Sequence, residues 1–260
     1  MTGSLAQFAA QYAVHRAAEG RGLRGQALRS LPYLRSGPLA QQWSVRARSF
    51  DFFLRRVVSA RHNPLHVLDL GAGNCWLCFR LACLGHAAVG VDIRGDDVDG
   101  LGAAADLLSD VPNPFQRVIA SFEELPFAAK SFDVTVFNAS LHYARDLSRV
   151  LQEAMRVTRS GGLIVVMDSP FYRHQDDGEA MIREKRALGQ TCFGPRAAIL
   201  LNQKFIEYLT RDRLCDAWPE LAWFRHRVRY PLWYEMRAIR ARLARGRRPS
   251  RFDIWTAQVP

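Results

Sequence analysis

Ten residues with the sequence VLDLGAGNCW, Val67 to Trp76, carry the most informative pattern in the chain. A short apolar run leads into Gly71 and Gly73, and a stretch with helical spacing follows. A strand that turns through glycines into a helix brings backbone N–H groups to the carboxyl edge of a sheet, where open α/β folds bind small ligands. Glycine suits such a turn because a Cβ would obstruct close approach of a ligand to the backbone. We therefore expect a ligand site here.

The residues around this turn discriminate between ligands. A dinucleotide fingerprint needs a third glycine where this chain has Trp76, and a Walker-type loop needs Gly-Lys-Ser/Thr, which does not follow the turn. Asp69 would repel a pyrophosphate but suits an ammonium group. Asp92 lies 19 residues after Gly73 and is placed to accept hydrogen bonds from both hydroxyls of a ribose. A ligand with a ribose, a positive amino group and no phosphate corresponds to S-adenosylmethionine.

The elements that must position these residues alternate between strands and helices. Apolar runs predict strands at 66–70, 87–92, 117–121, 132–137, 162–167, 221–230 and 252–257. Helical spacing separates most of them, at 76–84, 96–108 and 147–158. This order predicts an α/β fold, in which a Rossmann-like, seven-stranded, mostly parallel sheet carries helices on both faces.

The flanking segments are expected to be mainly helical. Before the first strand we predict helices at 6–19 and 39–60, joined by a connecting stretch at 21–38, with the arginines of 39–60 on its outer face. After the fifth strand we predict a helical cap at 178–188 and 197–210, and a basic helix at 231–245. The expected division is a helical lid at 1–62, a ligand-binding core at 63–170, and a cap that also completes the sheet at 171–260.

Composition restricts the class of protein. The 260 residues are 48% hydrophobic and 23% charged, which excludes a disordered or collagen-like chain. No apolar run approaches the about 18 residues of a membrane span. We expect a cytoplasmic protein because no signal-peptide pattern opens the chain, although its arginine-rich start also has the composition of an organellar transit peptide. Cys75 and Cys78 lack a second pair at ligand spacing, so we expect packing residues and no metal site.

The net charge of +11 is unevenly distributed. Residues 1–62 contain ten arginines and two acidic residues. Residues 63–170 contain eight basic and thirteen acidic residues, and residues 171–260 contain eighteen basic and ten acidic residues. Basic flanks are compatible with nucleic acid or an anionic membrane surface, and a segment at 233–248 places Met236, Ile239 and Leu243 on one stripe among arginines. Only three of the 36 basic residues are lysine, so a compositional preference for arginine is an equally simple explanation.

At these residues the chain resembles the class I S-adenosylmethionine-dependent methyltransferases. The resemblance covers about residues 60–170. Beside the glycine turn it includes EELPF at 123–127, SFDVTVFNASLHY at 131–143, residues 151–156 and RSGGLIVVMD at 159–168. It implies S-adenosylmethionine as the cofactor and S-adenosylhomocysteine as the product.

The resemblance also implies roles for individual residues. Around the cofactor, from its methionine end to its adenine, it places Gly71, Ala72, Gly73 and Asn138, then Asp92 at the ribose, and Ile93, Ser121 and Phe122 at the adenine. Members of the family often have an acidic residue where this chain has Ser121, which accepts a hydrogen bond as a shorter, neutral side chain.

The expected reaction is transfer of a methyl group to an oxygen, nitrogen or carbon of a small-molecule acceptor. The family has no universal catalytic residue, because a base is needed only when the acceptor must lose a proton. His142, Tyr143 and Asp168 follow the fourth and fifth expected strands and are the candidates. Two alternatives stay open: an RNA or protein methyltransferase that uses the basic flanks, and a non-catalytic module that only binds the cofactor.

Overall fold

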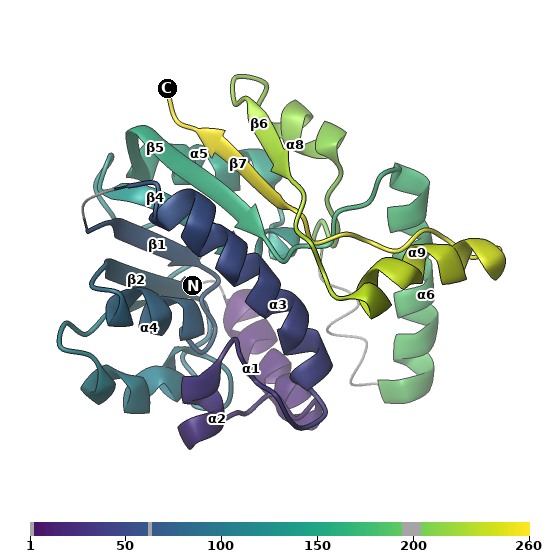
Figure 1. The fold of residues 1–260 in the computed structure, drawn as a ribbon, viewed down its shortest axis with the longest axis horizontal. Coiled ribbons are helices and arrows are strands. Elements are labelled where there is room, and N and C mark those ends of the chain that lie inside the picture. The colour runs from purple at the N-terminus through teal and green to yellow at the C-terminus, as the bar shows by residue number, and fades with distance from the viewer. Residues whose placement is uncertain (1–2, 62–63, 194–203) are drawn as a thin grey trace.

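The computed structural model describes residues 3–61, 64–193 and 204–260. Within them seven strands form one sheet in the order β3-β2-β1-β4-β5-β7-β6 (Figure 1). Strands β1 to β5 pair in parallel, β7 runs antiparallel to β5, and β6 runs antiparallel to β7. The strands are β1 (His66–Leu70), β2 (Ala87–Asp92), β3 (Gln116–Ile119), β4 (Phe132–Asn138), β5 (Thr158–Met167), β6 (Trp223–His226) and β7 (Ile254–Gln258).

Helices cover both faces of the sheet. The longer ones are α1 (Gly3–Ala18), α3 (Ala40–Phe53), α4 (Trp76–Cys83), α5 (Leu147–Val157), α6 (Gln175–Phe193) and α9 (Leu232–Leu243). The shorter ones are α2 (Gly25–Ser30), α8 (Arg211–Ala217), the π-helical turn η1 (Leu54–Val58) that continues α3, and the 3₁₀ segments η2 (Leu101–Asp110) and η3 (Leu141–Tyr143). None of the helices in these residue ranges is both long and apolar enough to cross a membrane.

The two layers follow from the alternation of side chains along the central strands. In β1, Val67 packs into the core that includes α3 and α4, whereas Leu68 and Leu70 pack into the core that includes α5 and α8. Successive side chains of a strand point to opposite faces, so an apolar run without interruption is buried on both. The expected seven-stranded, mostly parallel fold is thereby confirmed, including the helices before β1 and after β5.

Several local expectations differ from the structure. The prediction of a helix at 96–108 is wrong. Asp96 Oδ1 accepts hydrogen bonds from the N–H groups of Val98 and Asp99 and stabilises a turn there. A 3₁₀ segment begins only at Leu101. Of the helix expected at 197–210, residues 197–203 lie outside the described ranges and 204–210 are not helical. Helix α8 was not expected, and α2 interrupts the connecting stretch.

Candidate active site at the carboxyl edge of the sheet

A cavity of about 340 Å³ opens where β1, β2, β4 and β5 end. Helices α1 and α3 and two aromatic residues of the C-terminal half close it from the other side. All but one of the residues expected at the site line this cavity: Gly71, Ala72, Gly73, Asp92, Ile93, Ser121, Phe122, Asn138, His142, Tyr143 and Asp168. The topology thus brings together residues that are spread over a hundred positions of the chain.

The backbone N–H groups of the glycine turn are already used within the protein. The N–H groups of Gly71 and Ala72 both donate to the carbonyl of Val91, at 2.8 and 2.9 Å. The N–H of Gly73 donates to Asp92 Oδ2 at 2.8 Å. A phosphate site requires free N–H groups that point at the anion. This turn therefore suits a neutral or cationic ligand and not a pyrophosphate.

Gly71 is required for a reason that the sequence did not indicate. Its φ is +76°, and a Cβ at this position would lie 2.3 Å from Cβ of Ser140. Ser140 hydrogen-bonds through its hydroxyl to the carbonyl of Leu70, so it is held against the turn. A side chain at position 71 is therefore excluded by the loop after β4, whether or not a ligand also approaches the turn.

Asp92 is fixed at the end of β2 with its carboxylate at the cavity. Oδ1 accepts from the N–H of Arg94 at 2.9 Å, and Oδ2 accepts from Gly73. Burial raises the pKa of this carboxyl, and the hydrogen bonds from Arg94 and Gly73 oppose that rise. Each carboxylate oxygen has two lone pairs, so both remain able to accept a further hydrogen bond from a hydroxyl group.

Asp69 is the expected site residue that does not line the cavity. It is completely buried, because its side chain points from β1 toward α4, where the Cys78 thiol donates to Oδ2 at 3.8 Å. Burial, together with the nearby Asp92, raises the pKa of Asp69 to about 8. At neutral pH this carboxyl is largely protonated, so it is not the fixed anion beside an ammonium group that its place in the sequence indicated.

Two side-chain oxygens of residues that line the cavity are buried without a hydrogen-bond partner among the described residues. They are Oδ1 of Asn138, at the end of β4, and Oδ2 of Asp168, at the end of β5. A buried acceptor without a donor is costly. A ligand that carries N–H or O–H donors would satisfy both, which agrees with the ammonium and hydroxyl groups of the expected cofactor and acceptor.

Where the family pattern implies contact with adenine, Ser121 stands in place of the usual acidic residue. Ser121 and Phe122 border the cavity after β3, and the Ser121 hydroxyl accepts from the N–H of Glu123 at 3.1 Å. Phe122 packs edge-on against Phe137, with ring centroids 6.2 Å apart. Ile93, which follows the neighbouring strand β2, adds an aliphatic side chain to the cavity lining.

Asp168 belongs to a hydrogen-bonded chain that sequence reasoning missed. The Ser49 hydroxyl, on α3, donates to Asp168 Oδ1 at 2.6 Å and lies 3.0 Å from the Tyr230 hydroxyl, which donates to the carbonyl of Phe252 at 2.6 Å. Burial raises the pKa of Asp168 to about 6, against the opposing influence of Arg46 and Ser49. Asp168 is therefore ionised at neutral pH but can take up a proton within the physiological range.

His142 and Tyr143 line the same cavity as Asp168, and the pKa of His142 is shifted in the opposite direction. Burial lowers the pKa of His142 to about 3, and the positive charges of Lys185 and Arg46 add to this effect. The imidazole is thus neutral, with Nδ1 3.3 Å from the Ser169 hydroxyl. The Tyr143 hydroxyl is 2.7 Å from that of Tyr12 on α1.

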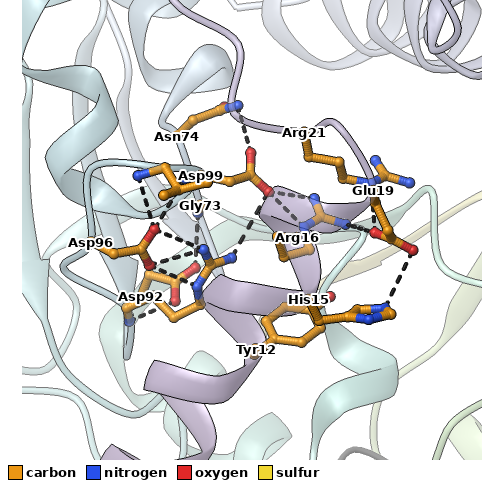
Figure 2. Close-up of polar contacts among 12 residues, drawn as sticks. Tyr12, His15, Arg16, Glu19, Arg21, Gly73, Asn74, Asp92, Asp96 and Asp99 are labelled. Carbon is orange, nitrogen blue, oxygen red and sulfur yellow. Dashed lines mark hydrogen bonds and ion pairs between the residues drawn. The ribbon is translucent and has the colours of Figure 1, made fainter. Parts of the chain in front are cut away.

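Helix α1 is attached to the core by contacts at the mouth of the cavity. Arg16 lies 2.5 Å from Asp99, whose other oxygen accepts from the Asn74 amide at 3.0 Å (Figure 2). The Arg94 guanidinium lies over the ring of Tyr12, 5.2 Å from its centroid, and is paired with Asp96. Phe8, Tyr12 and Arg16 line the cavity. The first helix is therefore part of the site wall.

Arg46 is a second residue that the sequence placed wrongly. We expected the arginines of 39–60 on an outer face, but Arg46 lines the cavity, where burial lowers its pKa and the charge of Asp168 partly offsets this. Its guanidinium lies 4.9 Å from the Trp43 ring centroid. The spacing of Trp43, Arg46 and Phe50 along one helical face was the available signal.

A smaller cavity of about 200 Å³ extends the site toward α6. It shares His142, Tyr143, Pro170 and Phe205 with the main cavity. Lys185 and Glu207, which pair at 2.6 Å, form its far side. Among the described residues no group of three His, Cys, Asp or Glu side chains could hold a metal ion.

Comparison with known proteins agrees with this geometry. Residues 68–166 match the family model of the methyltransferase domain. They form a class I S-adenosylmethionine-dependent methyltransferase domain. S-adenosylmethionine is the cofactor of this family, and it fits a turn whose N–H groups are engaged, Asp92 and the unpartnered oxygen of Asn138.

Curated relatives share this methyltransferase domain at low identity. The chain is 29% identical to a sterol 4-C-methyltransferase of Caenorhabditis elegans over 104 residues, which is 40% of this chain but 31% of that one. It is 29% identical to a demethylmenaquinone methyltransferase of Mycobacterium sp. (strain KMS) over 171 residues, or 66% and 68% of the two chains. The match thus spans about a third of the first relative and two thirds of the second.

Solved structures share the fold of the methyltransferase domain and its flanks. The [4+2]-cyclase SpnF has a TM-score of 0.57 at 17% identity, with 85% of this chain and 82% of that one covered. A methyltransferase from Methanosarcina mazei has a TM-score of 0.52 at 16% identity, with 78% and 96% covered. At this identity the likeness establishes the fold alone.

Proposed function

We propose that this protein is an enzyme that transfers the methyl group of S-adenosylmethionine to a small-molecule acceptor. The observation that carries the proposal is one cavity that extends from the glycine turn and Asp92, after β1 and β2, to His142 and Asp168, after β4 and β5. One end suits the cofactor, and the other offers room and polar groups for a second molecule. A module that only binds the cofactor does not need the second part.

The proposed cofactor contacts follow the lining residues. The backbone of Gly71 to Gly73 and the Asn138 oxygen would lie against the methionine end, and Asp92 would accept hydrogen bonds from the ribose. Ile93, Ser121 and Phe122 would enclose the adenine. When bound, S-adenosylmethionine supplies a methyl group on a positively charged sulfur, which makes that methyl electrophilic.

The acceptor that fits best is an apolar molecule with a ring. The wall opposite the glycine turn is aromatic, and its rings pack on one another: Phe8 on Phe205 at 5.0 Å and Tyr143 on Phe205 at 5.7 Å between centroids. Aromatic walls favour flat or apolar ligands and exclude water from the reacting groups. Two of the relatives are named for a sterol and for demethylmenaquinone, which supports an acceptor of this kind.

Asp168 is our candidate for the group that removes a proton from the acceptor. Its Oδ2 faces the cavity without a partner, and its pKa of about 6 leaves it ionised and still basic at neutral pH. His142, with a pKa of about 3, is a much weaker base. The Tyr143 hydroxyl is already engaged with Tyr12 and is better suited to shaping the cavity.

An RNA or protein acceptor is the competing hypothesis. The N-terminal arginines that would bind an anionic polymer are partly engaged within the protein, since Arg16 pairs with Asp99, Arg21 with Glu19 and Arg29 with Asp110. Charges neutralised in this way contribute little to a counterion-driven complex. Methyl transfer that falls steeply with added salt would favour the polymer over the small molecule.

Incubation with methyl-labelled cofactor and fractionated extract tests the proposal. We expect label in the lipid-extractable, low-molecular-weight fraction. Label in RNA or protein would replace the proposed acceptor, and cofactor binding without any transfer would leave only a binding module. Calorimetry of Asp92→Ala should show affinity for S-adenosylmethionine reduced at least about tenfold, since charge-assisted bonds are lost. Unchanged affinity in a folded variant would contradict the site.

A further inference from the structure

Helix α9 exposes an apolar stripe on its outer side. Leu232, Ile239 and Leu243 are 77%, 51% and 79% exposed. At about 100° per residue they fall within one narrow sector of the helix, with the half-buried Met236 in the same sector. Isolated exposed apolar residues need no explanation, whereas a continuous stripe marks a surface that contacts something else.

This stripe is not the side by which α9 packs on the protein. The buried residue of the helix is Tyr234, which is 3% exposed and whose hydroxyl accepts from the N–H of Phe252 at 3.0 Å. Nine residues separate Tyr234 from Leu243, so at about 100° each the two lie on opposite sides of the helix. Figure 1 shows α9 in an outer position beside α6, away from the sheet, and Arg247 pairs with Glu184 of α6 at 2.7 Å.

Arginines border the stripe on both sides. On the helical wheel Arg240 follows it on one side and Arg242 on the other, and Arg245 comes just after the helix end. Within the described ranges these three guanidinium groups form no ion pair or hydrogen bond. The acid on this helix, Glu235, is already paired with Arg251 at 2.8 Å. The exposed face of α9 therefore combines aliphatic side chains with uncompensated positive charge.

We propose that this face binds the surface of an anionic lipid bilayer. Aliphatic side chains would enter the boundary between headgroups and acyl chains, while the flanking arginines reach the anionic headgroups. The helix has 12 residues and is about 18 Å long, shorter than the about 30 Å of the hydrocarbon core, so it would lie along the interface.

Other occupants fit this face less well. A nucleic acid would use the arginines but gain nothing from Leu232, Ile239 and Leu243, because phosphates and sugars do not solvate aliphatic groups. In a symmetric pair of chains the same face meets itself, and Arg240 and Arg242 would then oppose their own copies at a cost. Of these three partners, the anionic membrane is the one that can contact both the aliphatic side chains and the arginines favourably.

Co-sedimentation with vesicles tests the proposal without any methyl acceptor or cofactor, so its outcome is independent of the proposed reaction. We expect the protein to bind vesicles of equal parts phosphatidylcholine and phosphatidylglycerol, and to bind pure phosphatidylcholine far more weakly. The triple variant Leu232→Gln/Ile239→Gln/Leu243→Gln should lose at least about tenfold in partitioning. Arg240→Gln/Arg242→Gln should lose roughly fivefold for each arginine removed.

Matched variants control for general changes in hydrophobicity and charge. Ile119→Gln removes an apolar side chain that is 61% exposed on β3, at the opposite edge of the sheet, and Arg55→Gln/Arg56→Gln removes two exposed arginines on η1. Both should bind as the wild type does. No binding by the wild type, or equal binding by the triple variant with its circular dichroism unchanged, would overturn the proposal. A dimer that the triple variant abolishes would instead assign the face to a second copy, and RNA binding unaffected by that variant would assign the arginines to nucleic acid.

Discussion

Arg16 and Asp99 are 83 positions apart in the chain and form a 2.5 Å ion pair at the mouth of the cavity. Through this pair, and through the hydrogen bond between Tyr12 and Tyr143, α1 is joined to the loops that follow β2 and β4. Because α1 forms one wall of the cavity, the attachment of the N-terminal helix and the binding of ligand are physically connected.

Releasing this attachment should weaken ligand binding. In Tyr12→Phe/Arg16→Gln we expect faster amide hydrogen exchange in α1 and affinity for S-adenosylmethionine reduced about tenfold, because part of the wall is no longer held. Arg48→Gln removes an exposed arginine of α3 and serves as the control. Unchanged exchange in α1 of the double variant would show that packing alone holds the helix.

The pH dependence of turnover should identify the base. If Asp168 removes the proton, kcat falls about tenfold per pH unit below its pKa of about 6, because only the ionised carboxylate accepts. Asp168→Asn should lower kcat by roughly 10²–10⁴ and remove this limb. Ser49→Ala deletes the hydrogen bond that favours the ionised form, so it should move the limb to higher pH. A wild-type limb that persists in Asp168→Asn would exclude this residue.

The buried carboxyl of Asp69 should make stability depend on pH. Its folded pKa of about 8 exceeds the unfolded value of 3.8, so the folded state holds the extra proton between these values. The free energy of unfolding should therefore fall as pH rises from about 4 to about 8. Asp69→Asn removes this penalty and should be more stable than the wild type at pH 9, by up to about 6 kcal/mol.

Denaturant titrations at pH 5, 7 and 9 would measure this effect. The exposed Asp216 of α8 provides the control, since Asp216→Asn should follow the wild type at every pH. A pH profile of Asp69→Asn that parallels the wild type would mean that Asp69 stays ionised in the fold.

The contact between Gly71 and Ser140 should appear as an energetic coupling. Gly71→Ala forces a Cβ against Ser140 and keeps a positive φ, so we expect a loss of about 2–4 kcal/mol in unfolding free energy. Ser140→Gly opens the space, and the double variant should recover part of the loss but not the part due to φ. Simple additivity in a double-mutant cycle would refute the contact.

The sequence alone determined the parts of this protein that depend on local pattern. Short apolar runs predicted the strands. The positions of Gly73 and Asp92, each just after a strand, predicted that these two residues meet at one edge, since parallel neighbouring strands end together. The family was indicated by a resemblance, because the glycine turn and the later blocks stand in this chain in the order and at the separations typical of class I methyltransferases.

Only the tertiary structure decided how these residues are used. The burial of Asp69 depends on α4 covering one face of β1, and the pKa of Asp168 depends on its burial and on Ser49, which is 119 positions away. Arg46 turns inward and Leu232, Ile239 and Leu243 turn outward because of the neighbours that α3 and α9 meet. Helical spacing tells which residues share a face, but burial and charge depend on distant segments that no local pattern encodes.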